Sequence, residues 1–95
     1  MWTVKVTRKA AKQLGKLPSQ IQSRFDLLAK ELEVGGPLRN NWTHFGRLHG
    51  AANAQLYHCH IKSGRPTYVV CWEVLNKEIK LLEVYYAGTH EKAPY

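Results

Sequence analysis

Residues 67–72 read TYVVCW, and this stretch decides the fold. Its β-branched and aromatic side chains are typical of a central strand that is buried on both faces. Two further strands are expected at roughly 55–62 and 78–87, and short turns join all three segments. The sequence therefore predicts three consecutive strands in the second half of the chain, with residues 66–75 in the middle.

The first half of the chain predicts one strand and two helices. Residues 2–6 alternate in character, which indicates a short strand with one buried face. Residues 8–16 read as a short basic helix, which Gly15 and Pro18 terminate. A longer helix is expected from about Pro18 to the GGP sequence at 35–37. One apolar stripe at the helical period runs along it, formed by Ile21, Phe25, Leu28 and Leu32.

The expected fold class is α+β, with the element order β-α-α-β-β-β. Two N-terminal helices are expected to pack on one face of a small, mainly antiparallel four-stranded sheet, which leaves the other face free for function. Residues 37–54 are expected to form a loop that Trp42, Phe45 and Leu48 pin to the core. With 95 residues, the chain is expected to form a single domain over residues 1–95.

The charge distribution favours an anionic partner. The chain carries 14 Lys and Arg against 7 Asp and Glu, which gives a formal net charge of +7. No Asp or Glu occurs between Val34 and Trp72, although that stretch holds four Lys or Arg and four His. A basic region without acids is what binding to a nucleic acid requires, because each neutralised phosphate releases counterions. The alternative is that the net charge only keeps a small protein in solution.

Several classes of protein are excluded by the composition. The chain is too apolar and too aromatic for a disordered tail, at 44% hydrophobic residues. No apolar run approaches the roughly 18 residues of a membrane-spanning helix, so no membrane partner is expected. The N-terminus lacks the features of a secretory signal. Cys59 and Cys71 are therefore expected to be reduced thiols in the cytoplasm.

The strand that reads YHCHI at 57–61 holds the strongest candidates for chemistry. Strand alternation places His58, His60 and Lys62 on one face, and their neighbours Tyr57, Cys59 and Ile61 on the core face. Histidine can give or take a proton near neutral pH. The alternative is a solvated strand face that is merely basic.

No cofactor or metal is expected from these residues. A zinc site would need Cys59 beside the two histidines, and alternation points it away from them. The sequence contains no Cys-x-x-Cys motif, no Gly-x-Ser-x-Gly elbow for a serine nucleophile and no glycine-rich phosphate loop.

The C-terminal segment 85–95 reads YYAGTHEKAPY and combines three aromatic residues with His90 and Lys92. Tyr and His rings can stack on unpaired bases, and Lys can hold a phosphate. The alternative is a frayed terminus, which is common in small domains.

In order and spacing, these segments resemble the RelE/ParE superfamily of bacterial toxins from type II toxin–antitoxin systems, and within it the RelE- and HigB-like members. The resemblance covers essentially the whole chain. It rests on the element order, on the basic first helix and on four segments: LHG at 48–50, YHCHI at 57–61, YVVCWEV at 68–74 and VYYAGTHEK at 84–92.

The resemblance implies a toxin that cleaves mRNA, inhibits translation in association with the ribosome and is held by a cognate antitoxin. His58 and His60 stand where RelE-like members carry a basic pair that contacts the RNA backbone. His90 matches a basic residue after the last strand, and Tyr95 matches a tyrosine that orients the scissile nucleotide. The catalytic residues are thus expected to be His58, His60, His90 and Tyr95. The expected substrate-binding residues are Arg47, Lys62, Arg65, Tyr86 and Lys92.

Metal-free RNA cleavage needs a base for the 2′-hydroxyl proton, cations beside the phosphate and an acid for the leaving 5′ oxygen. His58 or His60, together with His90, are the candidates for base and acid, and Lys62 and Arg65 are the candidates for the cations. The sequence departs from the RelE pattern at His58 and His60, in the expected strand at 55–62, where RelE-like members carry Lys. It also lacks an arginine within the next strand, for which Arg65 is the candidate substitute.

Two other functions stay open at this point. ParE-like members share the fold, poison DNA gyrase and need no catalytic residues. A non-catalytic RNA-binding module would account for the charge of the chain, although it would not account for the clustered histidines.

Overall fold

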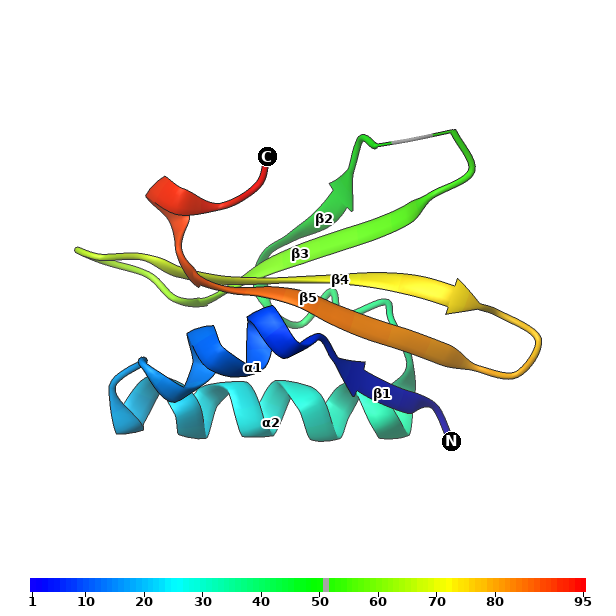
Figure 1. Cartoon of the computed structure of the whole chain (residues 1–95), viewed down its shortest axis with the longest axis horizontal. Coiled ribbons are helices and arrows are strands. Elements are labelled where there is room, and N and C mark those ends of the chain that lie inside the picture. The colour runs from blue at the N-terminus through cyan, green and yellow to red at the C-terminus, as the bar shows by residue number, and fades with distance from the viewer. Residues whose placement is uncertain (51) are drawn as a thin grey trace.

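The structure is a computed structural model that describes residues 1–50 and 52–95. A five-stranded sheet in the order β1-β5-β4-β3-β2 carries two helices on one face, and the C-terminal segment lies on the other (Figure 1). The elements are β1 (Thr3–Val6), α1 (Arg8–Gly15), α2 (Ser19–Gly35), β2 (Thr43–Leu48), β3 (Gln55–Lys62), β4 (Tyr68–Asn76), β5 (Leu81–Thr89) and the 3₁₀ helix η1 (His90–Lys92). Among the described residues, neither α-helix is long and apolar enough to cross a membrane.

The sheet is antiparallel except at one edge. β1 pairs in parallel with β5, and Thr3 lies opposite Leu81 in that register. β5 also pairs with β4, β4 with β3 and β3 with β2, all antiparallel. The expected α+β class and the single helix-covered face are confirmed.

Local sequence signals set the ends of both helices. Thr7 caps α1, because its hydroxyl accepts a hydrogen bond from the Ala10 amide at 3.0 Å. α2 ends at Gly35 and is capped by Gly36, whose φ of 88° lies in the left-handed region that glycine adopts without strain. A Cβ atom at Gly36 would lie only 2.8 Å from the indole nitrogen of Trp2. Glycine at this position therefore serves both the turn and the packing of the N-terminal segment.

The main core lies between the helices and the sheet. The α2 stripe predicted from the sequence is buried, as are Cys59, Ile61 and Trp72 on the helix-side face of the sheet. Along β4, Val70 and Trp72 point toward this main core, whereas Val69 and Cys71 point toward the other face. Val69 and Cys71 form a smaller core there with Tyr86. The prediction that the central strand is buried on both faces is confirmed.

The expected loop at residues 37–54 is wrong in part, because Thr43–Leu48 form a fifth strand. β2 is an edge strand that pairs only with β3, and its register shifts between Thr43 and Gly46. His44 within it has a positive φ of 54°. A short strand with an internal irregularity, a glycine and three polar residues has no alternation for sequence analysis to detect. Its pairing with β3 holds it in place.

Two β-bulges change which side chains share a face. On β3, His60 lies opposite Val69 and Lys62 lies opposite Tyr68, so Ile61 is an extra residue. The Arg24 guanidinium of α2 donates a hydrogen bond to the Ile61 carbonyl. On β5, Tyr85 is the extra residue between the pairs that β4 makes with Val84 and Tyr86. Both Tyr85 and Tyr86 consequently pack against the smaller core.

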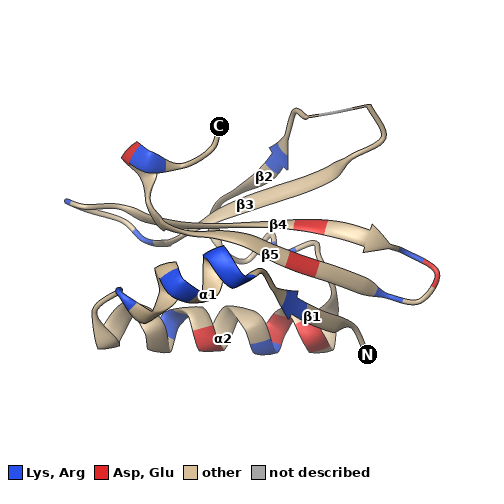
Figure 2. Cartoon of the chain, in the orientation of Figure 1, with Lys and Arg blue, Asp and Glu red and all other residues tan. Residues whose placement is uncertain are grey.

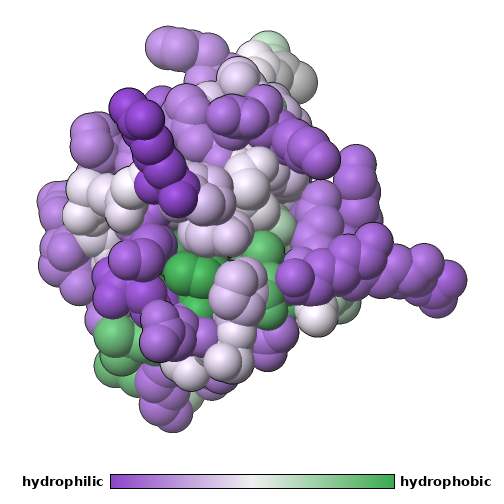
Figure 3. All heavy atoms as spheres, turned by 90° about the vertical axis from the view of Figure 1, so that its left-hand side faces the viewer, coloured by the Kyte–Doolittle hydropathy of each residue, from purple (hydrophilic) through white to green (hydrophobic). Residues whose placement is uncertain are grey.

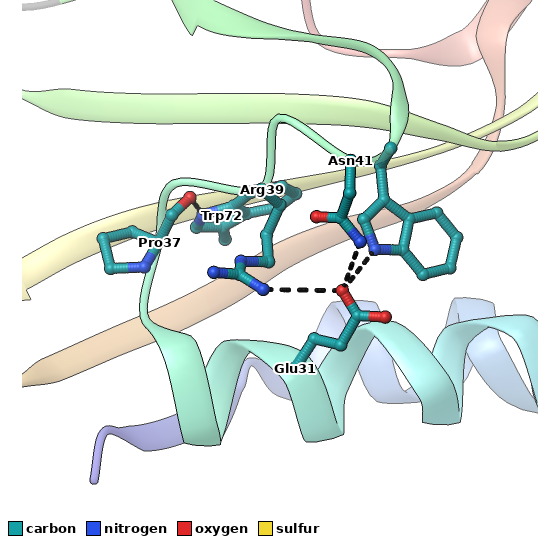
Figure 4. A network of polar contacts seen from close by, with 6 residues as sticks. Glu31, Pro37, Arg39, Asn41 and Trp72 are labelled. Atoms are coloured by element: carbon teal, nitrogen blue, oxygen red, sulfur yellow. Dashed lines mark hydrogen bonds and ion pairs between the residues drawn. The ribbon is translucent and has the colours of Figure 1, made fainter.

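A polar network fixes the segment between α2 and β2 (Figure 4). One carboxylate oxygen of Glu31 accepts hydrogen bonds from Asn41 at 2.7 Å, Trp42 at 3.0 Å and Arg39 at 3.4 Å. The Asn41 hydrogen bond is the main cause that lowers the pKa of Glu31, so the carboxylate stays charged. The Trp72 indole donates to the Pro37 carbonyl at 3.1 Å. These hydrogen bonds therefore fix the position of the backbone just before β2 begins.

Candidate functional site

Two histidines of β3 project from the helix-free face of the sheet. His58 lies opposite Cys71 of β4, and His60 lies opposite Val69, both members of the smaller core. Tyr57 and Cys59 alternate with them and pack toward the helices. The face predicted for these histidines from strand alternation is therefore the face they occupy.

The sheet and the C-terminal segment bring four aromatic rings of the expected site together. The ring of His60 lies 5.4 Å from that of His90 and 6.4 Å from that of His58, between centroids. Tyr95 stacks on His58 at 4.8 Å and meets His90 edge-on at 5.9 Å. The backbone amide of His90 donates to the Thr67 carbonyl at 2.8 Å, which anchors η1 beside β4. All four residues expected to be catalytic thus lie in one cluster.

A fifth ring in this cluster, that of His44, was missed by sequence reasoning. It stacks on His60 with centroids 4.3 Å apart. His44 lies on β2, which was expected to be a loop, and its left-handed backbone breaks strand alternation. Its place in the acid-free stretch was the one signal that pointed to it. The histidine cluster is defined from here on as His44, His58, His60 and His90.

Burial and mutual repulsion lower the pKa of His58 and His60. Burial is the main cause for both residues, and the neighbouring histidines add repulsion between positive charges. The Nδ1 atom of His58 is buried and has no hydrogen-bond partner among the described residues. Both imidazoles are consequently held neutral at physiological pH, the form in which a ring nitrogen can accept a proton.

These lowered pKa values predict how stability changes with pH. The unfolded chain binds protons from about pH 6.5 downward, whereas the folded chain rejects them until the pH reaches the lower folded pKa values. The free energy of unfolding is therefore expected to be highest above about pH 6.5 and to decline as pH falls below it. Urea unfolding at a series of pH values measures this decline. A His58→Gln/His60→Gln variant should show a shallower decline between pH 7 and pH 5, and an identical slope in both proteins would contradict the lowered pKa values of these two histidines.

An open pocket of about 650 Å³ adjoins the histidine cluster at the end of the sheet. His60, Arg65 and His90 line it, together with Thr67, Thr89 and Glu91 among others. Arg65 comes from the turn between β3 and β4 and is exposed. Figure 3 views this end of the molecule, where strongly hydrophilic side chains surround a small apolar patch. The pocket thus combines two imidazoles with a permanent positive charge.

The structure does not bring the other four expected substrate-binding residues into this pocket. Lys62 was expected on the face of His60, and this is wrong, because the bulge at Ile61 pairs Lys62 with Tyr68. Tyr68 packs against the helix-side core, and Lys62 lines a hollow beside the start of α2. Arg47 pairs with Tyr57 and donates to the Ala54 carbonyl, so it also lies away from the histidines.

Of the remaining two residues, Tyr86 lies on β5 and Lys92 lies on η1. Tyr86 is buried in the smaller core, and its hydroxyl donates to the Thr89 carbonyl at 2.6 Å. Tyr86 therefore packs with Val69 and Cys71, the residues opposite His60 and His58, and its hydroxyl proton is already used in that hydrogen bond. Lys92 lines a different groove, which lies between η1 and α1.

The cysteines take no part in the site. Both are free and buried, and burial raises the pKa of each thiol to about 12. Cys59 faces the helices and Cys71 the other side of the sheet. Within residues 1–50 and 52–95, no group of three or more His, Cys, Asp or Glu side chains is arranged to hold a metal ion.

Solved structures share this architecture over nearly the whole chain. A chain of the archaeal RelE–RelB complex from Pyrococcus horikoshii superposes with a TM-score of 0.76 at 23% identity, over 97% of this chain and 98% of that one. A chain of the intact E. coli RelBE toxin–antitoxin complex gives a TM-score of 0.72 at 18% identity, over 97% and 100% of the two chains. A mutant of the E. coli toxin RelE in the free state gives a TM-score of 0.71, again at 18% identity, over 97% and 86%.

The chain has the RelE fold. The likeness to RelE predicted from the sequence is confirmed at the level of architecture. No protein-family model matches the chain, and no curated protein matches it. On this fold, the chain gathers four histidines from β2, β3 and η1.

Proposed function

We propose that this chain is the toxin of a type II toxin–antitoxin system and acts in the cytoplasm as a metal-independent mRNA endoribonuclease on translating ribosomes. The observation that carries the proposal is the pocket in which His60, His90 and Arg65 meet. The RelE fold supports the toxin class, and the paired imidazoles support catalysis over a purely binding role.

The pocket offers the groups that cleavage of an RNA phosphodiester needs. In this proposal, the neutral His60 accepts the proton of the 2′-hydroxyl, whose oxygen attacks the adjacent phosphorus. His90 donates a proton to the 5′ oxygen as its bond to phosphorus breaks. The products are a 2′,3′-cyclic phosphate and a free 5′-hydroxyl. Arg65 stabilises the negative charge that builds on the phosphoryl oxygens.

The remaining rings of the cluster have supporting roles in this scheme. His44 stacks on His60 and restricts how that ring turns, and the positive charges of His44 and His90 would repel a proton from it. The ring of His58 lies 6.4 Å from that of His60. Tyr95 is half exposed, and burial raises its pKa, so its ring stays a neutral phenol. A neutral aromatic ring beside the pocket can stack on a base of the RNA.

The charge of the chain supports both an RNA substrate and an acidic antitoxin segment. Acidic residues lie on α2, in the middle of β4 and β5, and in the hairpin between those strands, whereas α1 carries only basic charges (Figure 2). The pocket end of the sheet is therefore positive, apart from Glu91. An antitoxin that covers this end with acidic side chains would associate faster at low salt than at high salt.

Expression of the chain without an antitoxin is expected to stop growth by blocking translation. After induction, pulse labelling with an amino acid should fall before labelling with thymidine or uridine. The His60→Ala variant, expressed to the same level, is the control and should permit growth, because it lacks the proposed base. If DNA synthesis falls first and gyrase-linked breaks accumulate, the chain is a gyrase poison and the nuclease proposal is wrong.

A further inference from the structure

A second groove lies beside the pocket and is lined by lysines from two distant parts of the sequence. Its volume is about 680 Å³, and its lining includes Lys9 and Gln13 of α1, Lys16 just after that helix, Tyr85 of β5 and Lys92 of η1. We call this surface the lysine groove. None of its three lysines belongs to the histidine cluster, and the cleavage scheme uses none of them.

The geometry of α1 makes the lysine groove a linear array of charge. Lys9 lies in the first turn of α1, and Lys16 caps its C-terminus with helical dihedral angles (φ −95°, ψ −6°). The two residues are seven apart, so they lie on the same side of the helix, separated by about 10 Å along its axis. Lys92 approaches from the opposite wall. All three are exposed, and Glu91 is the single acidic residue in the lining. Such an array is long enough for about two or three backbone phosphates.

The walls of the lysine groove are held in place. The Gln13 side-chain oxygen accepts a hydrogen bond from the Ala87 amide at 3.1 Å, which joins α1 to β5. The bulge at Tyr85 turns that ring toward the smaller core, where it is half buried, so part of the lining is aromatic. A fixed wall with lysines and an aromatic ring is the combination that binds single-stranded nucleic acid.

The lysine groove is continuous with the pocket of His60 and His90. Thr89 and Glu91 line both, so the two hollows meet where β5 runs into η1. A strand whose scissile phosphate sits in the pocket therefore has a basic path along which it can leave. The path leads across η1 toward α1.

We propose that the lysine groove binds the backbone of single-stranded RNA on one side of the scissile phosphate. This inference rests on the proposed function, because it assumes that the pocket receives RNA. The groove adds affinity for a long strand without taking part in the bond-breaking step. A trinucleotide seated in the pocket does not reach it, whereas a strand of about twelve nucleotides does.

The test compares two triple variants that lose the same charge. The groove variant carries Lys9→Ser, Lys16→Ser and Lys92→Ser. The control carries Lys5→Ser, Lys30→Ser and Lys77→Ser, at positions outside every hollow described above. The probes are fluorescent 2′-O-methyl RNAs of three and twelve nucleotides, which bind without being cleaved. Circular-dichroism melts establish that each variant is folded.

The groove variant is expected to bind the twelve-nucleotide RNA at least about tenfold more weakly than the control does, with the trinucleotide unchanged. Its plot of log K against log salt should be shallower by about 2, because three phosphate contacts at about 0.7 each are lost. Equal losses of RNA affinity in the two variants would overturn the proposal for the lysine groove, since the change in net charge alone would then explain them. The proposal that the groove binds RNA is also wrong if the groove variant loses affinity for an antitoxin while its affinity for both RNAs is unchanged.

Failure of the proposed function is measured separately. The wild-type chain is assayed for cleavage of mRNA on ribosomes, where the groove variant should raise KM more than it lowers kcat. If the wild type cleaves and the two variants do not differ in RNA binding, the groove inference alone fails. If the wild type neither cleaves nor binds either RNA, the proposed function fails and the groove inference fails with it.

Discussion

Replacing His60 with Ala is expected to lower RNA cleavage on the order of 10²-fold, the usual contribution of one general acid or base. His60 lies at the centre of the histidine cluster, between His44 and His90, and it lines the pocket with Arg65. Its side chain is partly exposed, so the variant should keep its fold. Cleavage of mRNA on ribosomes gives the rate, and circular dichroism checks the fold.

The other members of the cluster refine this expectation. His90→Ala should cost about as much as His60→Ala, and the double variant should cost little more than either, because the two residues act as a unit. His58→Ala is a less clean test, since His58 is packed beneath Tyr95. His49→Ala is the matched control, because His49 lies in the loop after β2, beside a separate hollow. If the His58, His60 and His90 variants all cleave as the wild type does, catalysis does not take place here.

Replacing Trp72 with Ala is expected to destabilise the protein by about 3–5 kcal/mol, the usual cost of removing a buried aromatic side chain. Trp72 is 0% exposed, and its ring lies near those of Phe45 and Tyr57. The variant also loses the hydrogen bond to Pro37 that holds the segment before β2. The free energy of unfolding of small domains is only about 5–15 kcal/mol, so this substitution is expected to remove a large part of it.

Urea unfolding followed by circular dichroism measures this loss. Val34→Ala is the control, because Val34 is 63% exposed and its loss should cost no more than about 0.5 kcal/mol. The stability of Trp72→Phe should fall between those of the two Ala variants, since the smaller ring keeps part of the packing and loses the rest together with the indole hydrogen bond to Pro37. A Trp72→Ala protein as stable as the Val34→Ala protein would show that this core position is not what holds β2 and β4 together.

The sequence alone predicts the parts of this fold that have a regular period. The α2 stripe follows from helical periodicity, and the face of His58 and His60 follows from strand alternation. The burial of β4 on both faces follows from its unbroken run of β-branched and aromatic residues. β2 could not be predicted in this way, because His44 and Gly46 interrupt its alternation and its pairing with β3 supplies its stability. His44 was missed as a site residue for the same reason.

The bulges are the second source of error. An extra residue is invisible in the amino-acid pattern, although it moves every side chain that follows to the other face. The bulge at Ile61 takes Lys62 away from the pocket, and the one at Tyr85 buries Tyr86 in the smaller core. Arg65 lies in a turn, where no alternation is needed to predict its exposure.

The parallel pairing of β1 with β5 joins the two ends of the chain, since Thr3 and Leu81 are about 80 residues apart. A contact across so long a loop forms late in folding. During synthesis, the backbone of β1 therefore stays unpaired beside α2 until β5 has been made. The proposed catalytic pocket has no second imidazole before that moment. The histidine cluster is therefore assembled only after β5 has been made and has paired with β1 and β4.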